Sequence, residues 1–96
     1  MLVAEIQKKI TPILRSYGIK RASVFGSHAR GDAREDSDVD ILLTIGTARL
    51  SLWDMERLRD DLSQKLGRSV DVVSDKAIVP GFRDSIYKDI QLVYEG

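Results

Sequence analysis

The chain has 96 residues, a length that suits one domain, residues 1–96, with a single hydrophobic core. Its 15 acidic and 15 basic side chains cancel, which argues against a general nucleic-acid binder, and the absence of cysteine excludes disulfides and thiolate metal sites. No apolar run reaches the length of a membrane span and the N-terminus lacks signal-peptide features, so we expect a soluble, cytoplasmic protein without membrane partners.

Hydrophobic periodicity predicts a first helix over residues 2–17, which Gly18 ends. Pro12 is expected to kink or interrupt this helix, because proline lacks a backbone donor and crowds the preceding turn. A short strand over Arg21–Phe25 follows, and a turn leads from it into a short helix over Ser27–Arg30.

The segment Val39–Ile45 predicts a second strand that is buried on both faces, because its apolar residues are nearly continuous rather than alternating. The clearest helix signals lie over Leu50–Gly67, where Ser51 and Asp54 form a capping box and Gly67 provides a left-handed stop. The predicted buried stripe of this helix consists of Leu52, Met55, Leu58, Leu62 and Leu66.

A third strand over Ser69–Val73, a helix that begins at Pro80 and a final extended piece over Leu92–Tyr94 complete the chain. The order is therefore helix, strand, short helix, strand, helix, strand, helix and a final extended piece. This order predicts an α+β fold in which helices pack on a small mixed sheet.

Aspartates interrupt two of these apolar strands. Asp40 lies within the second strand and Asp71 within the third, although aspartate is depleted in strands and an unpaired buried carboxylate is costly. Asp38 shares a strand face with Asp40, so the two carboxylates repel each other unless a cation lies between them. Oxygen ligands without histidine or cysteine favour Mg²⁺ or Mn²⁺ over Zn²⁺. The pattern favours a divalent-metal site, with solvated strand ends as the alternative.

Gly26 and Ser27 form the turn after the first strand. Glycine lets the backbone approach a phosphate, the start of a helix exposes unpaired N–H groups, and the Ser27 hydroxyl can donate to a phosphate oxygen. The guanidinium of Arg30 or Arg34 could supply a forked donor. A plain helix cap with a surface arginine also accounts for this segment. His28, the single histidine, is expected at a solvent-facing turn rather than as a general base.

These motifs together resemble the minimal nucleotidyltransferases, a family of the superfamily related to DNA polymerase beta. The family signature Gly-Ser-x-Ala-Arg-Gly followed by Ser-Asp-x-Asp matches GSHARG at residues 26–31 and SDVD at residues 37–40. A third aspartate follows in SVDVV at residues 69–73. The resemblance runs over nearly the whole chain and implies a polymerase-beta-like nucleotidyltransferase core.

The resemblance also implies roles for individual residues. Gly26 and Ser27 would hold the triphosphate of the substrate, expected to be ATP, and Arg30 is assigned to the same group without a definite role. Asp38 and Asp40 would ligate two Mg²⁺ ions. Asp71 would ligate the ion that activates the attacking hydroxyl. The reaction would move a nucleoside monophosphate to an acceptor hydroxyl and release pyrophosphate.

The chain has no room for a further domain that binds the acceptor, so the acceptor is expected to dock on an exposed face. Members of the resembled family are often paired with a small helical HEPN toxin, which implies an antitoxin that adenylylates a tyrosine of this partner. Two alternatives stay open. One is a non-catalytic module that blocks its partner by contact, and the other is a nucleotidyltransferase acting on a small molecule or an RNA end. The sequence leaves the oligomeric state undecided.

Overall fold

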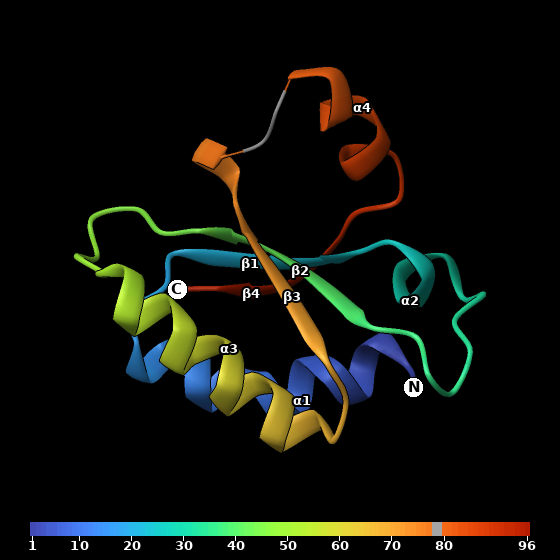
Figure 1. Ribbon diagram of the computed structural model, residues 1–96, viewed down its shortest axis with the longest axis horizontal. Coiled ribbons are helices and arrows are strands. Elements are labelled where there is room, and N and C mark those ends of the chain that lie inside the picture. Colours follow the sequence, from blue (N-terminus) through green and yellow to red (C-terminus); the bar gives the residue numbers. More distant parts are fainter. Residues whose placement is uncertain (78–79) are drawn as a thin grey trace.

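The computed structural model describes residues 1–77 and 80–96, without the side chains of residues 80, 82, 83 and 85. In chain order its elements are α1 (Val3–Ser16), β1 (Arg21–Phe25), α2 (Ser27–Arg30), β2 (Val39–Thr44), α3 (Leu52–Leu66), β3 (Val70–Ser74), a 3-10 turn (Asp75–Ala77), α4 (Pro80–Lys88) and β4 (Gln91–Glu95) (Figure 1). This order confirms the predicted one.

The four strands form one sheet in the order β3-β2-β1-β4. β1 runs antiparallel to both β2 and β4, whereas β2 and β3 run parallel, so the sheet is mixed as predicted. Parallel strands need a crossover connection, and α3 lies within it. Figure 1 shows α1 and α3 together on one side of the sheet and α4 on the other.

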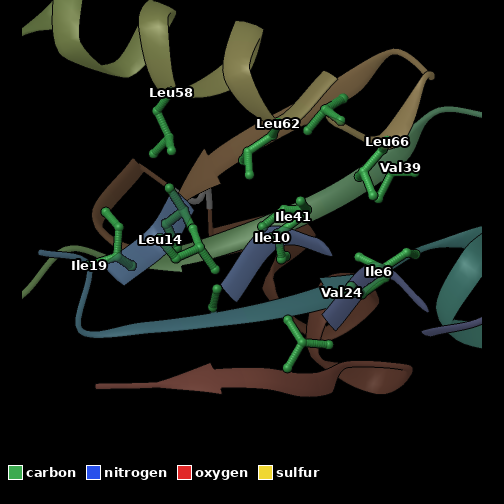
Figure 2. Close-up of a cluster of buried hydrophobic side chains, with 14 of the residues drawn as sticks. Ile6, Ile10, Leu14, Ile19, Val24, Val39, Ile41, Leu58, Leu62 and Leu66 are labelled. Carbon is green, nitrogen blue, oxygen red and sulfur yellow. The ribbon is translucent and has the colours of Figure 1, made fainter. Parts of the chain in front are cut away.

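The hydrophobic core lies between the sheet and the two long helices, as Figure 2 shows. The helical side chains at its centre are Ile6, Ile10, Leu14, Leu58, Leu62 and Leu66. From β2, Val39, Ile41 and Leu43 enter the same core. Leu42, on the opposite face, is only 4% exposed, which confirms the predicted burial of this strand on both faces. The β2 residues between the core positions therefore face away from α1 and α3.

The capping signals of α3 are confirmed. Ser51 Oγ accepts a hydrogen bond from the Asp54 amide at 3.1 Å, and Asp54 Oδ2 accepts one from the Ser51 amide at 2.9 Å. Gly67 ends the helix in the left-handed conformation, with φ 67°. The predicted stripe is wrong at its first position, because Leu52 is 75% exposed. Leu50, which precedes the cap, packs against the core there instead.

Pro12 does not interrupt α1, contrary to the expectation, since the helix continues through it to Ser16. Pro12 is exposed, and so is Lys8, whose carbonyl loses its helical partner, so water can replace the missing hydrogen bond. The Thr11 hydroxyl also donates to the Gln7 carbonyl at 2.6 Å on the same stretch. No helix among the described residues combines the length and the apolar character needed to cross a bilayer.

Candidate functional site

The predicted aspartates belong to one face of the sheet, opposite α1 and α3. β2 and β3 pair in parallel with Asp40 directly beside Asp71. Neighbouring strands lie about 4.8 Å apart and residues in register point to the same face, so these carboxylates project from adjacent positions. Asp38 precedes β2 by one residue, and the Val39 amide donates to the Ser69 carbonyl at 3.0 Å. The extended pairing thus begins at the residue after Asp38.

Asp40 carries the electrostatic cost of this arrangement. It is half-buried, whereas Asp38 and Asp71 are exposed. Burial raises the pKa of Asp40, and the charges of Asp71 and Asp38 raise that pKa further, against smaller opposing effects of His28 and Arg30. Both causes act against the ionised carboxylate, because one removes water and the other adds like charge. A bound cation would relieve both effects at Asp40.

The described side chains do not form a ready-made metal site. Within residues 1–77 and 80–96, no three acidic, histidine or cysteine side chains are placed to hold one ion together. The donors nevertheless suit a hard divalent cation, because Asp38, Asp40 and Asp71 offer only oxygen ligands and repel one another without it. Metal binding by these three residues therefore stays a prediction.

Gly26 is fitted closely to the acidic cluster. Its backbone angles, φ 77° and ψ −152°, lie in a region that is open essentially only to glycine. A Cβ atom added there would overlap Asp40 Oδ2 and lie 3.2 Å from Asp40 Cγ. The side chain of Asp40 therefore lies against the backbone of the turn between β1 and α2. This contact joins the two halves of the sequence signature in space.

Ser27 and Arg30 lie at the two ends of α2, next to this turn. The Ser27 carbonyl accepts hydrogen bonds from the amides of Gly31 at 3.0 Å and Asp32 at 3.1 Å, which hold the short helix closed. The Arg30 guanidinium forms ion pairs with Asp32 at 3.2 Å and Asp89 at 3.7 Å. Two carboxylates thus share the charge of Arg30, and its nucleotide-binding role stays a prediction, as does that of Ser27.

His28 is buried, with 3% of its surface exposed, so the expectation of a solvent-facing turn residue is wrong. Its Nε2 lies 3.3 Å from the Ser37 carbonyl oxygen, which requires Nε2 to carry the hydrogen and donate. Its Nδ1 is buried without a hydrogen-bond partner among the described residues. His28 therefore supports the residue directly before Asp38. A helix of one turn gives no periodicity from which this burial could be predicted.

Replacing His28 with alanine is expected to lower the free energy of unfolding by about 2 kcal/mol, because a buried ring is lost and a cavity remains. His28→Gln retains a side-chain N–H donor for the Ser37 carbonyl, so we expect it to be less destabilising. Urea unfolding of both variants measures the difference. Equal destabilisation by alanine and glutamine would show that the hydrogen bond to Ser37 contributes nothing.

A hollow of about 640 Å³ opens beside the acids, between α3 and β3. Its polar lining includes Asp38, Arg59, Ser63, Gln64, Arg68 and Asp71. Gly26 and Ser27 do not line it. The volume lies in the range typical of ligand sites. Sequence reasoning missed this hollow because its arginines come from α3 and from the turn after it, far along the chain from Asp38.

Comparisons with known proteins agree on the type of domain. A family model described as Polymerase beta, Nucleotidyltransferase matches residues 8–96. The chain is 45% identical over 89 residues to a candidate protein adenylyltransferase of Methanocaldococcus jannaschii, covering 93% of this chain and 95% of that one. A solved candidate minimal nucleotidyltransferase superposes with a TM-score of 0.78 at 34% identity, covering 95% of each chain.

A further solved structure is similar in fold alone, with a TM-score of 0.75 at 18% identity over 99% of this chain and 74% of that chain. It is described as a tri-AMPylated HEPN toxin of Shewanella oneidensis in complex with its MNT antitoxin.

Proposed function

Because the chain belongs to the polymerase beta nucleotidyltransferase family, we propose that it transfers AMP from ATP to a tyrosine hydroxyl of a HEPN-type toxin and thereby acts as the antitoxin. The observation that carries this proposal is the sheet register, which sets Asp40 beside Asp71 and against the Gly26 turn. The arrangement brings both halves of the signature and the third aspartate to one place, as a nucleotidyl-transfer site requires.

In this reaction the acceptor oxygen forms a bond to the α-phosphorus of ATP, and the bond from that phosphorus to the oxygen bridging the β-phosphate breaks. Pyrophosphate leaves with the electron pair of that bond. Asp38, Asp40 and Asp71 would hold two Mg²⁺ ions, which would supply the charge neutralisation that the entering and leaving oxygens need. The part of this chain is to provide the three carboxylates that would bind those ions.

The remaining roles follow from position. Gly26 has no side chain, so the triphosphate can approach the backbone of the turn closely, and the Ser27 hydroxyl donates to a phosphate oxygen. Asp71 is exposed on β3 at the edge of the sheet, where an acceptor hydroxyl can reach it and pass on its proton. Positioning and charge neutralisation supply most of the rate enhancement in such a transfer.

Likeness to other proteins supports a protein acceptor and a HEPN-type partner, whereas tyrosine as the modified residue is what the family resemblance implies. A relative of 45% identity is described as a candidate protein adenylyltransferase, and a protein of the same fold is described in complex with an AMPylated HEPN toxin. The neutral net charge of the chain also favours a protein acceptor over a nucleic acid.

Incubation of the protein with Mg²⁺, a purified HEPN-type toxin and ATP radiolabelled at the α-phosphate is expected to label the toxin. ATP labelled at the γ-phosphate is the matched control and is expected to leave the toxin unlabelled, because that phosphate departs with pyrophosphate. Phosphoamino-acid analysis after nuclease treatment locates the acceptor. Label from the γ-phosphate, or none from the α-phosphate, would remove the proposed reaction.

A further inference from the structure

We propose that the hollow between α3 and β3 is the acceptor groove of this enzyme, and that Arg59 and Arg68 make it selective for a polypeptide segment with acidic residues beside the acceptor hydroxyl. The acceptor groove is defined by its polar lining, Asp38, Arg59, Ser63, Gln64, Arg68, Ser69 and Asp71. This inference rests on the proposed function, because it names the class of acceptor that the same site receives.

The position of the groove separates it from the nucleotide side of the cluster. Asp40 lies against Gly26, whereas Asp71 lies on the edge strand β3 and lines the groove together with Asp38. A triphosphate held at the Gly26 turn therefore reaches the acids from one side. The groove is open on the other side, and its volume of about 640 Å³ has room for a short peptide segment.

Arg59 is available to a binding partner. Its side chain is 44% exposed, and its guanidinium pairs only within its own helix, with Glu56 at 2.6 Å and Asp60 at 3.9 Å, among the described ion pairs. Exposed pairs of this kind contribute little to stability, so a carboxylate of a bound peptide can displace them. Arg59 therefore offers the groove a positive charge that costs little to redirect.

Arg68 also lines the groove, and a hydrogen bond holds its side chain in place. Its guanidinium donates to the Glu35 carbonyl, which fixes the side chain between the α3–β3 turn and the loop before Asp38. A guanidinium has five N–H donors, and this contact uses one nitrogen. Arg59 and Arg68 therefore both line the hollow that Asp38 and Asp71 also line. Acidic residues on the acceptor segment would meet both of them.

A polypeptide suits the groove better than a nucleic-acid strand. No aromatic residue is among the described residues that line it, and stacking on aromatic rings is the usual means of holding single-stranded bases. Ser63, Gln64 and Ser69 instead provide hydroxyl and amide groups that hydrogen-bond to peptide backbone. We therefore favour an acidic peptide as the occupant and treat an RNA end as an outcome of the test.

Two synthetic peptides of equal length test the groove directly. Each has a central tyrosine, flanked by glutamates in one peptide and by lysines in the other. They are titrated into isotopically labelled protein with Mg²⁺ and a non-hydrolysable ATP analogue, and amide resonances are followed by NMR. We expect the acidic peptide to shift the Ser63, Gln64 and Ser69 amides and the basic peptide to leave them unchanged. Absence of these shifts, or larger shifts with an oligoadenylate RNA, would overturn the proposal.

Charge reversal at one position separates this inference from the proposed function. Arg59→Glu is expected to weaken acidic-peptide binding about tenfold and to favour the basic peptide, because attraction becomes repulsion. Arg57→Glu on the same helix lies outside the groove lining and is the matched control, with both affinities unchanged. If the wild-type protein and Arg59→Glu both transfer α-labelled AMP equally to the two peptides, the acceptor groove is contradicted while the proposed transfer reaction stands. Selective binding without transfer to any acceptor would contradict the proposed function alone.

Discussion

Asp40→Asn is expected to reduce AMP transfer roughly a thousandfold, because the variant removes the central charge of the acidic cluster. The same substitution is expected to raise the melting temperature at neutral pH by several degrees. Burial and the charges of Asp71 and Asp38 raise the pKa of Asp40, so its ionised form disfavours the folded state. Asparagine has nearly the same shape without that charge. The loss of transfer activity and the gain in stability would then both result from replacing one carboxylate oxygen of Asp40 with an amide nitrogen.

The sign of the pH dependence follows from the direction of this pKa shift. Because the pKa of Asp40 is higher in the folded chain than its ordinary value of 3.8, the associated stability is fully present below pH 3.8 and is lost as the pH rises through the folded pKa. Asp40→Asn avoids this loss. Its advantage is therefore expected at neutral pH and should vanish below pH 3.8.

Thermal unfolding in the presence of a chelator measures the effect across this pH range, and a transfer assay measures activity. Asp36→Asn is the matched control, since Asp36 is exposed in the loop before the cluster and its replacement should change neither quantity. Addition of Mg²⁺ with an ATP analogue should stabilise the wild-type protein and the control more than Asp40→Asn. A variant that is less stable at neutral pH, or that transfers AMP normally, would contradict this account.

Gly26→Ala is expected to abolish transfer and to lower the free energy of unfolding by about 3 kcal/mol. Two costs add together here: the backbone angles exclude an L side chain, and the new methyl group would overlap Asp40 Oδ2. Urea unfolding and the transfer assay measure the two effects. Gly31→Ala is the matched stability control, because Gly31 also has a positive φ, 84°, but a Cβ there meets nothing within 4 Å.

A double-mutant cycle separates the two costs at Gly26. In an Asp40→Ala background the overlapping carboxylate is gone, and the remaining Asp40 Cβ lies 3.5 Å from the added methyl group, an ordinary contact distance. Gly26→Ala should therefore cost less in that background than in the wild type, with a clear coupling free energy. Purely additive effects would show that the turn and the acid do not constrain each other.

Local signals accounted for most of the fold. The strand Arg21–Phe25, the capping box of α3 and its glycine stop depend on neighbouring residues, and the structure confirms each of them. The pairing of Asp40 with Asp71 was also within reach, because two apolar strands each contained one aspartate and a helix between them implied parallel neighbours. The residues of the candidate site could therefore be identified from sequence patterns within this one chain.

The errors arose where distant segments decide the outcome. His28 is buried and contacts Ser37 in the loop before Asp38, and Leu50 rather than the exposed Leu52 packs against the core. The acceptor groove brings Asp38 together with Arg59, which lies on a helix after the second strand. Periodicity within one element carries no information about such neighbours.

Hydrogen bonds on either side of Asp38 bear on the role of the loop between the motifs at residues 26–31 and 37–40. The backbone is anchored at both neighbours of this aspartate, by His28 at Ser37 and by the Ser69 carbonyl at Val39. The position of the Asp38 carboxylate therefore does not depend on the length of the loop that precedes it. We therefore expect insertions or deletions in the loop between the two motifs to be tolerated, provided that the hydrogen bonds at Ser37 and Val39 are kept.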